Sequence, residues 1–167
     1  LKGSASALYG RFEPGGVVNF VTKKPLDKPF AEVGALYGSF DQLRLTGDVS
    51  LPRSKTVGFR VNISHDDREG FRDFTFSRDT FIAPVIRWKP SDATTVMLEG
   101  EYARKRGYFD RGFANDPLFL EAPRKRQFGE ADARYTNKGG VASLFVDHRF
   151  SDILSGRVAF GYSDFSK

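Results

Sequence analysis

From residue 30 onward, the sequence is a series of short segments in which apolar and polar side chains alternate. In the clearest of these, residues 42–51, Leu43 and Leu45 alternate with Arg44, Thr46 and Asp48. A period of two places successive side chains on opposite faces of a β-strand. Segments of about ten residues also match the length of a tilted strand that crosses a membrane. The same pattern recurs at residues 57–65, 95–103, 141–150 and 155–163.

Two further segments are less regular. Residues 31–37 alternate weakly, and residues 80–88 are apolar on both faces, so their register stays open. No stretch has a helical period, and no window approaches the 18 apolar residues of a membrane helix. An aromatic content of 14%, with 17 Phe, suits pleated and half-buried surfaces. The sequence therefore predicts an all-β fold of antiparallel amphipathic strands, about seven in number.

The connections between these strands alternate in length. Short links at 52–56, 89–93 and 151–153 alternate with long ones at 66–79 and 105–139. This pattern is typical of an outer-membrane barrel whose long loops are extracellular. A soluble sandwich also alternates in polarity, but loops of about 35 residues are uncommon without a functional reason. Trp88 near a short link, and Tyr37 and Tyr102 near the other end, fit interfacial aromatic belts or ordinary packing.

Charge decides which strand face meets lipid. A Lys or Arg facing lipid at the bilayer midplane costs about 2–4 kcal/mol. Turning the segments 42–51 and 57–65 over would expose Arg44 and Arg60 to lipid. We therefore expect the Leu and Val faces to point outward and the charged faces to line a polar interior.

Several other classes of function find little support in the composition. The net charge is +5, but Lys and Arg are interleaved with Asp and Glu, which argues against nucleic acid as a partner. With no Cys, disulfides and Cys metal sites are excluded. His65 and His148 lack an acidic partner at ligand spacing, and Glu99 with Glu101 is the one pair resembling catalytic carboxylates. No nucleophile, phosphate or zinc motif is present, so we predict neither an enzyme nor a protein-bound cofactor or metal.

The two long connections combine aromatic rings with cations. They read REGFRDFTFSR at 68–78 and RKRGYFDRGF at 104–113. Rings offer flat contact area to a bulky ligand, and cations attract the anionic oxygens of a metal chelate. Contact with lipopolysaccharide is the alternative explanation for such loops. The candidate ligand-binding residues are Phe71, Arg72, Phe74, Tyr108, Phe109, Arg111 and Phe113.

The N-terminal part carries a family resemblance. Residues 8–25, LYGRFEPGGVVNFVTKKP, together with KGSASA before them, resemble the end of the plug domain in TonB-dependent outer-membrane receptors. Ser4 stands where that family often has Pro. The run FIAPVIRWKPSDATTVMLEGEY at 81–102, FDRGF at 109–113 and GEADARYTNK at 129–138 are similar to the siderophore branch of the family. The resemblance extends from about residue 2 to residue 150.

The resemblance implies an architecture and an activity. Residues 1–25 would be the C-terminal end of the plug, and residues 26–167 the first part of a 22-stranded transmembrane barrel. With Leu1 first and no signal peptide visible, we expect a fragment that lacks the TonB box, most of the plug and the remaining strands. Such receptors reside in the bacterial outer membrane and import ferric siderophores, which arrive as chelates rather than cofactors.

The resemblance also implies partners. These are a ferric siderophore, TonB acting through the missing plug region, and outer-membrane lipid with lipopolysaccharide. Polar contacts between plug and barrel wall are expected at Arg11 and Glu13 on the plug side, and at Arg44, Asp48, Arg60, Glu99 and Glu101 on the wall. Cobalamin, haem or an oligosaccharide stays open as another cargo, and a soluble β-sandwich binding protein is the distant alternative. The sequence does not name the siderophore.

Overall fold

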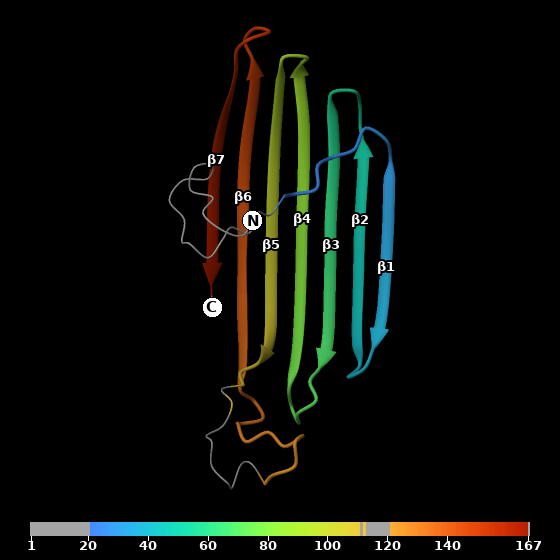
Figure 1. The fold of residues 1–167 in the computed structure, drawn as a ribbon, viewed down its shortest axis with the longest axis vertical. Helices are drawn as coiled ribbons and strands as arrows, with labels where there is room; N and C mark the ends of the chain where they lie inside the picture. The colour runs from blue at the N-terminus through green and yellow to red at the C-terminus, as the bar shows by residue number, and fades with distance from the viewer. Residues whose placement is uncertain (1–20, 111, 113–120, 167) are drawn as a thin grey trace.

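The alternating segments form strands that pair side by side into one sheet (Figure 1). The structure is a computed structural model that describes residues 21–110, 112 and 121–166. Within these residues the sheet has seven strands, which follow one another across it in chain order, each antiparallel to its neighbours. The strands are β1 (Phe30–Gly38), β2 (Gln42–Pro52), β3 (Val57–Glu69), β4 (Phe76–Ser91), β5 (Thr94–Tyr108), β6 (Arg134–Arg149) and β7 (Ser155–Ser166).

The prediction of an all-β fold with seven antiparallel strands is confirmed, but the bounds of the two long connections were wrong. The strands β3 to β6 continue beyond the alternating apolar segments, so the connections shrink to residues 70–75 and 109–133. Backbone ladder bonds need no apolar side chain, and here they pair charged residues such as Asp67 with Arg78. Apolar alternation therefore marks the part of each strand that has an apolar face, not the whole strand.

The two ends of the sheet differ. The links 53–56, 92–93 and 150–154 lie at one end, and the connections 70–75 and 109–133 lie at the other, beside the tight turn 39–41 (Figure 1). In that turn Phe40 and Asp41 have φ angles of 61° and 51°. We call these the short-link end and the long-connection end.

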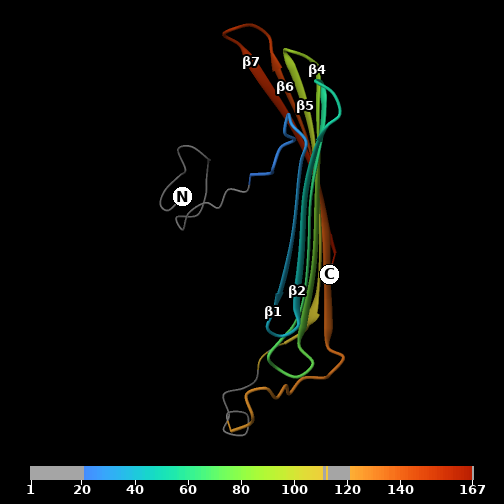
Figure 2. The same cartoon turned by 90° about the vertical axis from the view of Figure 1, so that its right-hand side faces the viewer.

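The sheet also has two chemically distinct faces. The apolar face carries side chains such as Leu45, Leu98 and Phe160, which are 45%, 47% and 64% exposed. The polar face carries Asp48 and Arg60, and Figure 2 shows the segment 21–29 standing off one side of the sheet. The hydrogen bonds of this segment place it on the polar face.

Register settles the orientation of residues 80–88, which the sequence left open. Arg60 pairs with Val85, and Val85 pairs with Glu99, so all three side chains lie on the polar face. Ile86 and Trp88 then lie on the apolar face. Val85 is 2% exposed, which makes it one of the few buried apolar side chains in the described part of the chain.

A proline sits within a central strand without breaking the sheet. Pro84 in β4 has no N–H to donate, and no ladder pair joins it to β5. Gly100 faces it on β5, where an added Cβ would lie 3.3 Å from the Pro84 Cγ. The glycine therefore leaves room for the ring. The described residues include no helix long and apolar enough to cross a membrane.

Candidate functional site

The segment 21–29 crosses the polar face and touches four neighbouring strands. From one end of the crossing to the other, Thr22 donates to Glu99 on β5, Lys23 to Asp48 on β2, and the Leu26 amide to Ser50 on β2. Side chains from β3 and β4 donate back to its carbonyl groups. We call this segment with its strand partners the crossing site.

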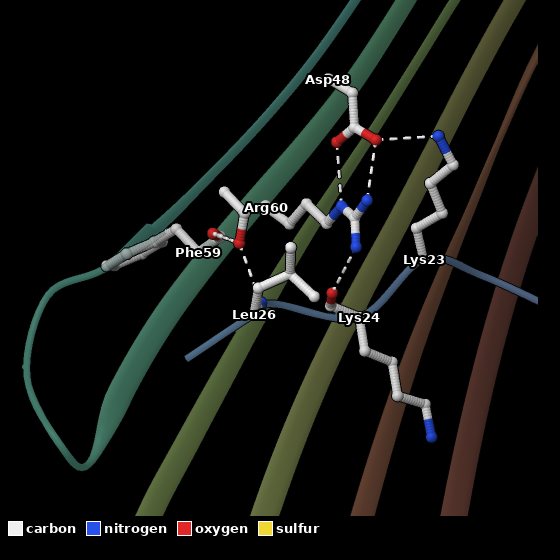
Figure 3. A network of polar contacts seen from close by, with 7 residues as sticks. Lys23, Lys24, Leu26, Asp48, Phe59 and Arg60 are labelled. Carbon is white, nitrogen blue, oxygen red and sulfur yellow. Dashed lines mark hydrogen bonds and ion pairs between the residues drawn. The ribbon is translucent and has the colours of Figure 1, made fainter. Parts of the chain in front are cut away.

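Asp48 is the centre of the crossing site (Figure 3). The residue is 6% exposed, and its carboxylate accepts two hydrogen bonds from Arg60, at 2.9 Å from Nε and 2.8 Å from Nη2. The Lys23 ammonium approaches the same carboxylate at 2.8 Å. A planar guanidinium matches a carboxylate in this two-bond geometry, so Arg60 is held in one orientation.

That orientation leaves the third nitrogen of Arg60 pointing at the crossing segment. Its Nη1 donates to the Lys24 carbonyl oxygen at 2.8 Å (Figure 3). The Arg60 side chain is 11% exposed, so these bonds form in a largely water-excluded place. One arginine thereby links β2, β3 and the crossing segment.

Ser50 provides a second fixed point. Its side chain is fully buried, its Oγ accepts from the Leu26 amide at 2.9 Å, and it donates to the Phe59 carbonyl oxygen at 3.3 Å. A segment outside any sheet must satisfy its backbone amides individually. Ser50 does so for Leu26.

Arg87 on β4 holds the next part of the segment. Its Nη1 donates to the Pro25 carbonyl oxygen at 3.1 Å, and its Nη2 reaches Asp27 at 2.5 Å. The hydrogen bond from Arg87 lowers the pKa of the Asp27 carboxyl below its ordinary value of 3.8. The Asp27 side chain is 83% exposed, so water screens this pair.

Close approach of the segment to the sheet depends on a glycine. Pro25 is buried against Gly58, where an added Cβ would lie 3.1 Å from the Pro25 Cβ and 3.4 Å from Arg87 Nη2. Any larger residue at position 58 would push the segment or Arg87 aside. Glycine at this place keeps the segment in contact with β3.

The residues expected at a plug–wall contact fall into three groups. Asp48, Arg60 and Glu99 touch the segment 21–29. Arg44 and Glu101 also lie on the polar face but line hollows nearer the long-connection end. Arg11 and Glu13 lie outside the described residues.

Sequence reasoning missed several members of the crossing site as contacts. Lys23 fell within the plug-like run at residues 8–25, and Ser50 within the alternating segment 42–51, with no contact predicted for either. The face on which Arg87 lies could not be predicted, because the sequence did not decide the register of residues 80–88. Asp48, by contrast, was expected among the inward-facing charges that contact the plug, and it lies in the crossing site beside Arg60 and Lys23. The interacting residues missed in this way are Thr22, Lys23, Ser50, Arg87 and Asp27.

A second candidate site lies at the long-connection end. A hollow of about 600 Å³ is lined by the connection 70–75 and by the strand residues Glu69, Phe76, Arg78 and Arg134. Phe71 and Phe74 are 57% and 61% exposed there.

This connection is tied to the longer one beside it. Arg72 Nη1 contacts Asp110 at 3.0 Å, and the Asp73 amide donates to the Lys125 carbonyl oxygen at 2.8 Å. The two candidate binding loops therefore form a joined surface.

The remaining ligand-binding candidates differ in accessibility. Phe109 is 47% exposed, whereas Tyr108 is 6% exposed. Arg111 and Phe113 lie outside the described residues. Of the seven candidates, Phe71, Arg72 and Phe74 line the hollow, and Tyr108 and Phe109 do not.

Possible catalytic or metal groups do not converge. His65 and His148 lie on the apolar face, where the Nδ1 of His65 is within hydrogen-bond distance of the Thr80 hydroxyl and the Nδ1 of His148 of the Thr94 hydroxyl. Among the described residues, no group of His, Asp and Glu is placed to hold a metal ion.

Comparison with known proteins identifies the family. The chain is 39% identical, over 166 residues, to the metal-pseudopaline receptor CntO of Pseudomonas aeruginosa, covering 97% of this chain and 23% of that protein. It is 32% identical, over 124 residues, to the probable TonB-dependent receptor BfrD of Bordetella pertussis, covering 70% and 16%. The chain belongs to the TonB-dependent outer-membrane receptors.

Solved structures agree on the fold of this TonB-dependent receptor chain. The siderophore receptor PiuA of Acinetobacter baumannii superposes with a TM-score of 0.84 at 21% identity, covering 98% of this chain and 25% of that one. No family model matches the chain. The chain spans less than a quarter of the length of CntO and of BfrD. These relatives are receptors of the outer membrane rather than enzymes, as the sequence predicted.

Proposed function

We propose that this chain is part of the wall of a receptor that imports ferric siderophores across the bacterial outer membrane. The observation that carries the proposal is the match to CntO along nearly the whole chain. The sheet supports it physically, because one face is apolar enough for lipid and the other is polar and carries the crossing site. We call the product of the full reading frame that contains this chain the complete receptor.

In this proposal, residues 1–25 are the end of the plug and residues 26–167 begin a 22-stranded barrel. The long-connection end then faces the outside of the cell. The ring and guanidinium surface at Phe71, Arg72 and Phe74 would take the chelate, its rings stacking on the ligand and its cation pairing with anionic oxygens.

The crossing site suits a plug that must move and return. TonB would pull on plug residues upstream, and the wall must hold the plug until then. When the segment leaves, water can replace the hydrogen-bond and ion-pair partners of the polar groups on both sides. Apolar surfaces that separate gain no such partners in water. Arg60 and Glu99 would act in this holding, and Arg44, Glu101, Arg11 and Glu13 remain proposed members.

One observation favours a second cargo. CntO is named for a metal–pseudopaline complex rather than for a ferric siderophore. A chelate of a metal other than iron is therefore the second candidate, and it would use the same rings and cations because these recognise the organic ligand rather than the metal.

Uptake by cells distinguishes these cargoes. We would express the complete receptor in a strain lacking its own siderophore receptors and supply radiolabelled iron, nickel, cobalt or zinc with a panel of chelators. The proposal predicts TonB-dependent uptake of iron with at least one siderophore. Uptake confined to another metal would favour the second candidate, and uptake of neither would contradict both.

Variants of the 70–75 connection test whether residues of this chain bind the chelate. Replacing Phe71 and Phe74 together by Ala should raise the half-saturating chelate concentration by about thirtyfold, since two ring contacts of on the order of 1 kcal/mol each sum to about 2 kcal/mol. The matched control replaces Phe150 and Leu154, which are 65% and 59% exposed at the short-link end. Equal effects of the two variants would remove the role assigned to the 70–75 connection.

A further inference from the structure

A hollow on the polar face lies between the connection 70–75 and the crossing site. It has a volume of about 410 Å³, and among the described residues it shares no lining residue with the hollow at Phe71 and Phe74. We call it the mixed-charge hollow, because cations and anions line it together. Its charged polar-face residues are Arg44, Asp66, Arg68, Asp79 and Lys105.

Strand register sets four of these charges in one row across the sheet. Arg44 on β2 pairs with Asp66 on β3, Asp66 pairs with Asp79 on β4, and Asp79 pairs with Lys105 on β5. The row therefore reads positive, negative, negative, positive. Neighbouring strands are about 4.8 Å apart, so the row spans roughly 14 Å.

The centre of the row is a pair of like charges. Carboxylates directly opposite each other on neighbouring strands repel. Asp66 accepts a hydrogen bond from Gln42 Nε2 at 3.0 Å, but its one ion pair within the described residues, with Arg68 Nε, is 4.0 Å long. The cations of the row therefore do little to offset the repulsion at Asp66.

The Asp79 carboxylate is also poorly satisfied. Its Oδ2 is 3.8 Å from Lys105 Nζ and 3.4 Å from Ser77 Oγ. Both distances exceed the roughly 2.7–2.9 Å of a good charge-assisted hydrogen bond. Its Oδ1 has no hydrogen-bond partner within the described residues. A further cation held between Asp66 and Asp79 would stabilise both carboxylates.

Arg44 supplies an available cation at one end of the row. It lies opposite Asp66, yet it forms no ion pair or hydrogen bond through its side chain within the part of the chain that the structure describes. Arg78 and Asp67 are also opposite in register, on the other face, and they bond at 2.9 Å and 3.0 Å. The Arg44 guanidinium can therefore take a carboxylate from the hollow in a two-bond geometry.

These charges together specify the chemistry of a ligand. An α-amino-acid group carries an ammonium and a carboxylate on one carbon atom. The ammonium has three donors and can lie between Asp66 and Asp79, while the carboxylate meets Arg44. Phe81 and Ala103 line the same hollow and offer apolar contact to the attached carbon chain. A purely anionic group would meet the two carboxylates unfavourably.

We propose that the mixed-charge hollow binds a free α-amino-acid group of the chelate, and that the receptor thereby selects chelators that carry one. This rests on the proposed function, in which the chelate enters at the long-connection end. The hollow lies on the way from the 70–75 connection to the crossing site, so a chelate held at the rings of Phe71 and Phe74 can reach it. A plug side chain is the competing occupant.

Four ferric chelates with one iron centre test the proposal. They are ferrioxamine B acylated on its amine with a γ-glutamyl, glutaryl, 4-aminobutyryl or butyryl group. These present an α-amino acid, a carboxylate alone, an ammonium alone and no charge. Isothermal titration calorimetry with the purified complete receptor should show the γ-glutamyl chelate binding about a hundredfold more tightly than the butyryl chelate, since each charge-assisted contact should contribute about tenfold.

Two variants assign the contacts to their residues. Arg44→Gln should bind the γ-glutamyl and 4-aminobutyryl chelates equally, because the carboxylate has lost its partner. Asp79→Asn should bind the γ-glutamyl and glutaryl chelates equally, because the ammonium has lost its partner. The matched controls, Arg157→Gln and Asp147→Asn, change a charged pair of the same face at the short-link end and should keep the full preference.

Three results would overturn the inference. These are equal affinity for the four chelates, no detectable binding of the γ-glutamyl chelate, or an equal loss for all four chelates in Arg44→Gln, which would assign Arg44 to the plug. Iron uptake by cells is measured separately. A receptor that imports iron with some siderophore but lacks the γ-glutamyl preference contradicts this inference alone, whereas no uptake with any siderophore contradicts the proposed function.

Discussion

The most informative perturbation is the replacement of Asp48 by Asn, which keeps the shape of the side chain and removes its charge. Asp48 is 6% exposed, and its partner Arg60 is 11% exposed in the side chain. Removing one partner of a buried pair leaves the other charge uncompensated, at a cost of about 3–5 kcal/mol. Lys23, whose side chain is 58% exposed, adds at most about 1 kcal/mol. We therefore expect Asp48→Asn to cost about 3 kcal/mol or more.

The assay is reversible urea unfolding of the complete receptor in lipid vesicles, read as a double-mutant cycle between positions 48 and 60. The matched control is the Asp147–Arg157 pair on β6 and β7, whose side chains are 38% and 62% exposed. Its cycle should give a coupling of about 0–1 kcal/mol. The Asp48–Arg60 coupling should exceed it by about 2 kcal/mol. Equal couplings for the two pairs would refute the reasoning.

Hydrogen exchange at the Leu26 amide adds a local readout to the same variants. This amide is protected by Ser50, and Arg60 holds the neighbouring Lys24 carbonyl group. Asp48→Asn should speed its exchange because Arg60 loses its fixed orientation, whereas Asp147→Asn should leave it unchanged.

Two other changes act on the same segment. Ser50→Ala should speed exchange of the Leu26 amide and cost about 1 kcal/mol of unfolding free energy, because the amide loses its acceptor; slow exchange in this variant would contradict the assignment. Arg87→Gln should loosen the segment more than Asp27→Asn, since Arg87 also holds the Pro25 carbonyl group. Because the pKa of Asp27 is lowered on docking, its contribution is present above pH 3.8 and lost as the pH falls further. Protection factors of the segment amides, each corrected for the intrinsic exchange rate at that pH, should fall in the unchanged receptor as the pH is lowered from 6 to 3, and the fall should be absent in Asp27→Asn.

The sequence was sufficient for the strands because the two faces of this sheet meet chemically different surroundings. Leu45 and Arg44 are adjacent in sequence but lie on opposite faces, and that contrast is readable without a structure. The contrast fades toward the long-connection end, where both faces carry charges, as at Asp66 and Asp67. Strand ends were therefore placed too early there.

The crossing site was less accessible to sequence reasoning. Its bonds join residues far apart in the chain, such as Thr22 with Glu99 and Pro25 with Arg87. Polarity identifies a side chain as inward-facing but does not say which segment it meets. Only register, which sets Ser50 opposite Arg60 and Arg60 opposite Val85, brings the right groups under the segment.

The central claim is that this sheet is a barrel wall with its apolar face in lipid and its polar face toward the plug. The chain contains no Cys, so single Cys positions along β5, residues 96–101, can carry a spin label once any Cys elsewhere in the complete receptor is removed. In lipid vesicles, labels at Val96 and Leu98 should collide with oxygen in the bilayer, and labels at Glu99 and Glu101 should not. Collision rates that do not alternate along β5, or that alternate in the opposite phase, would contradict the account.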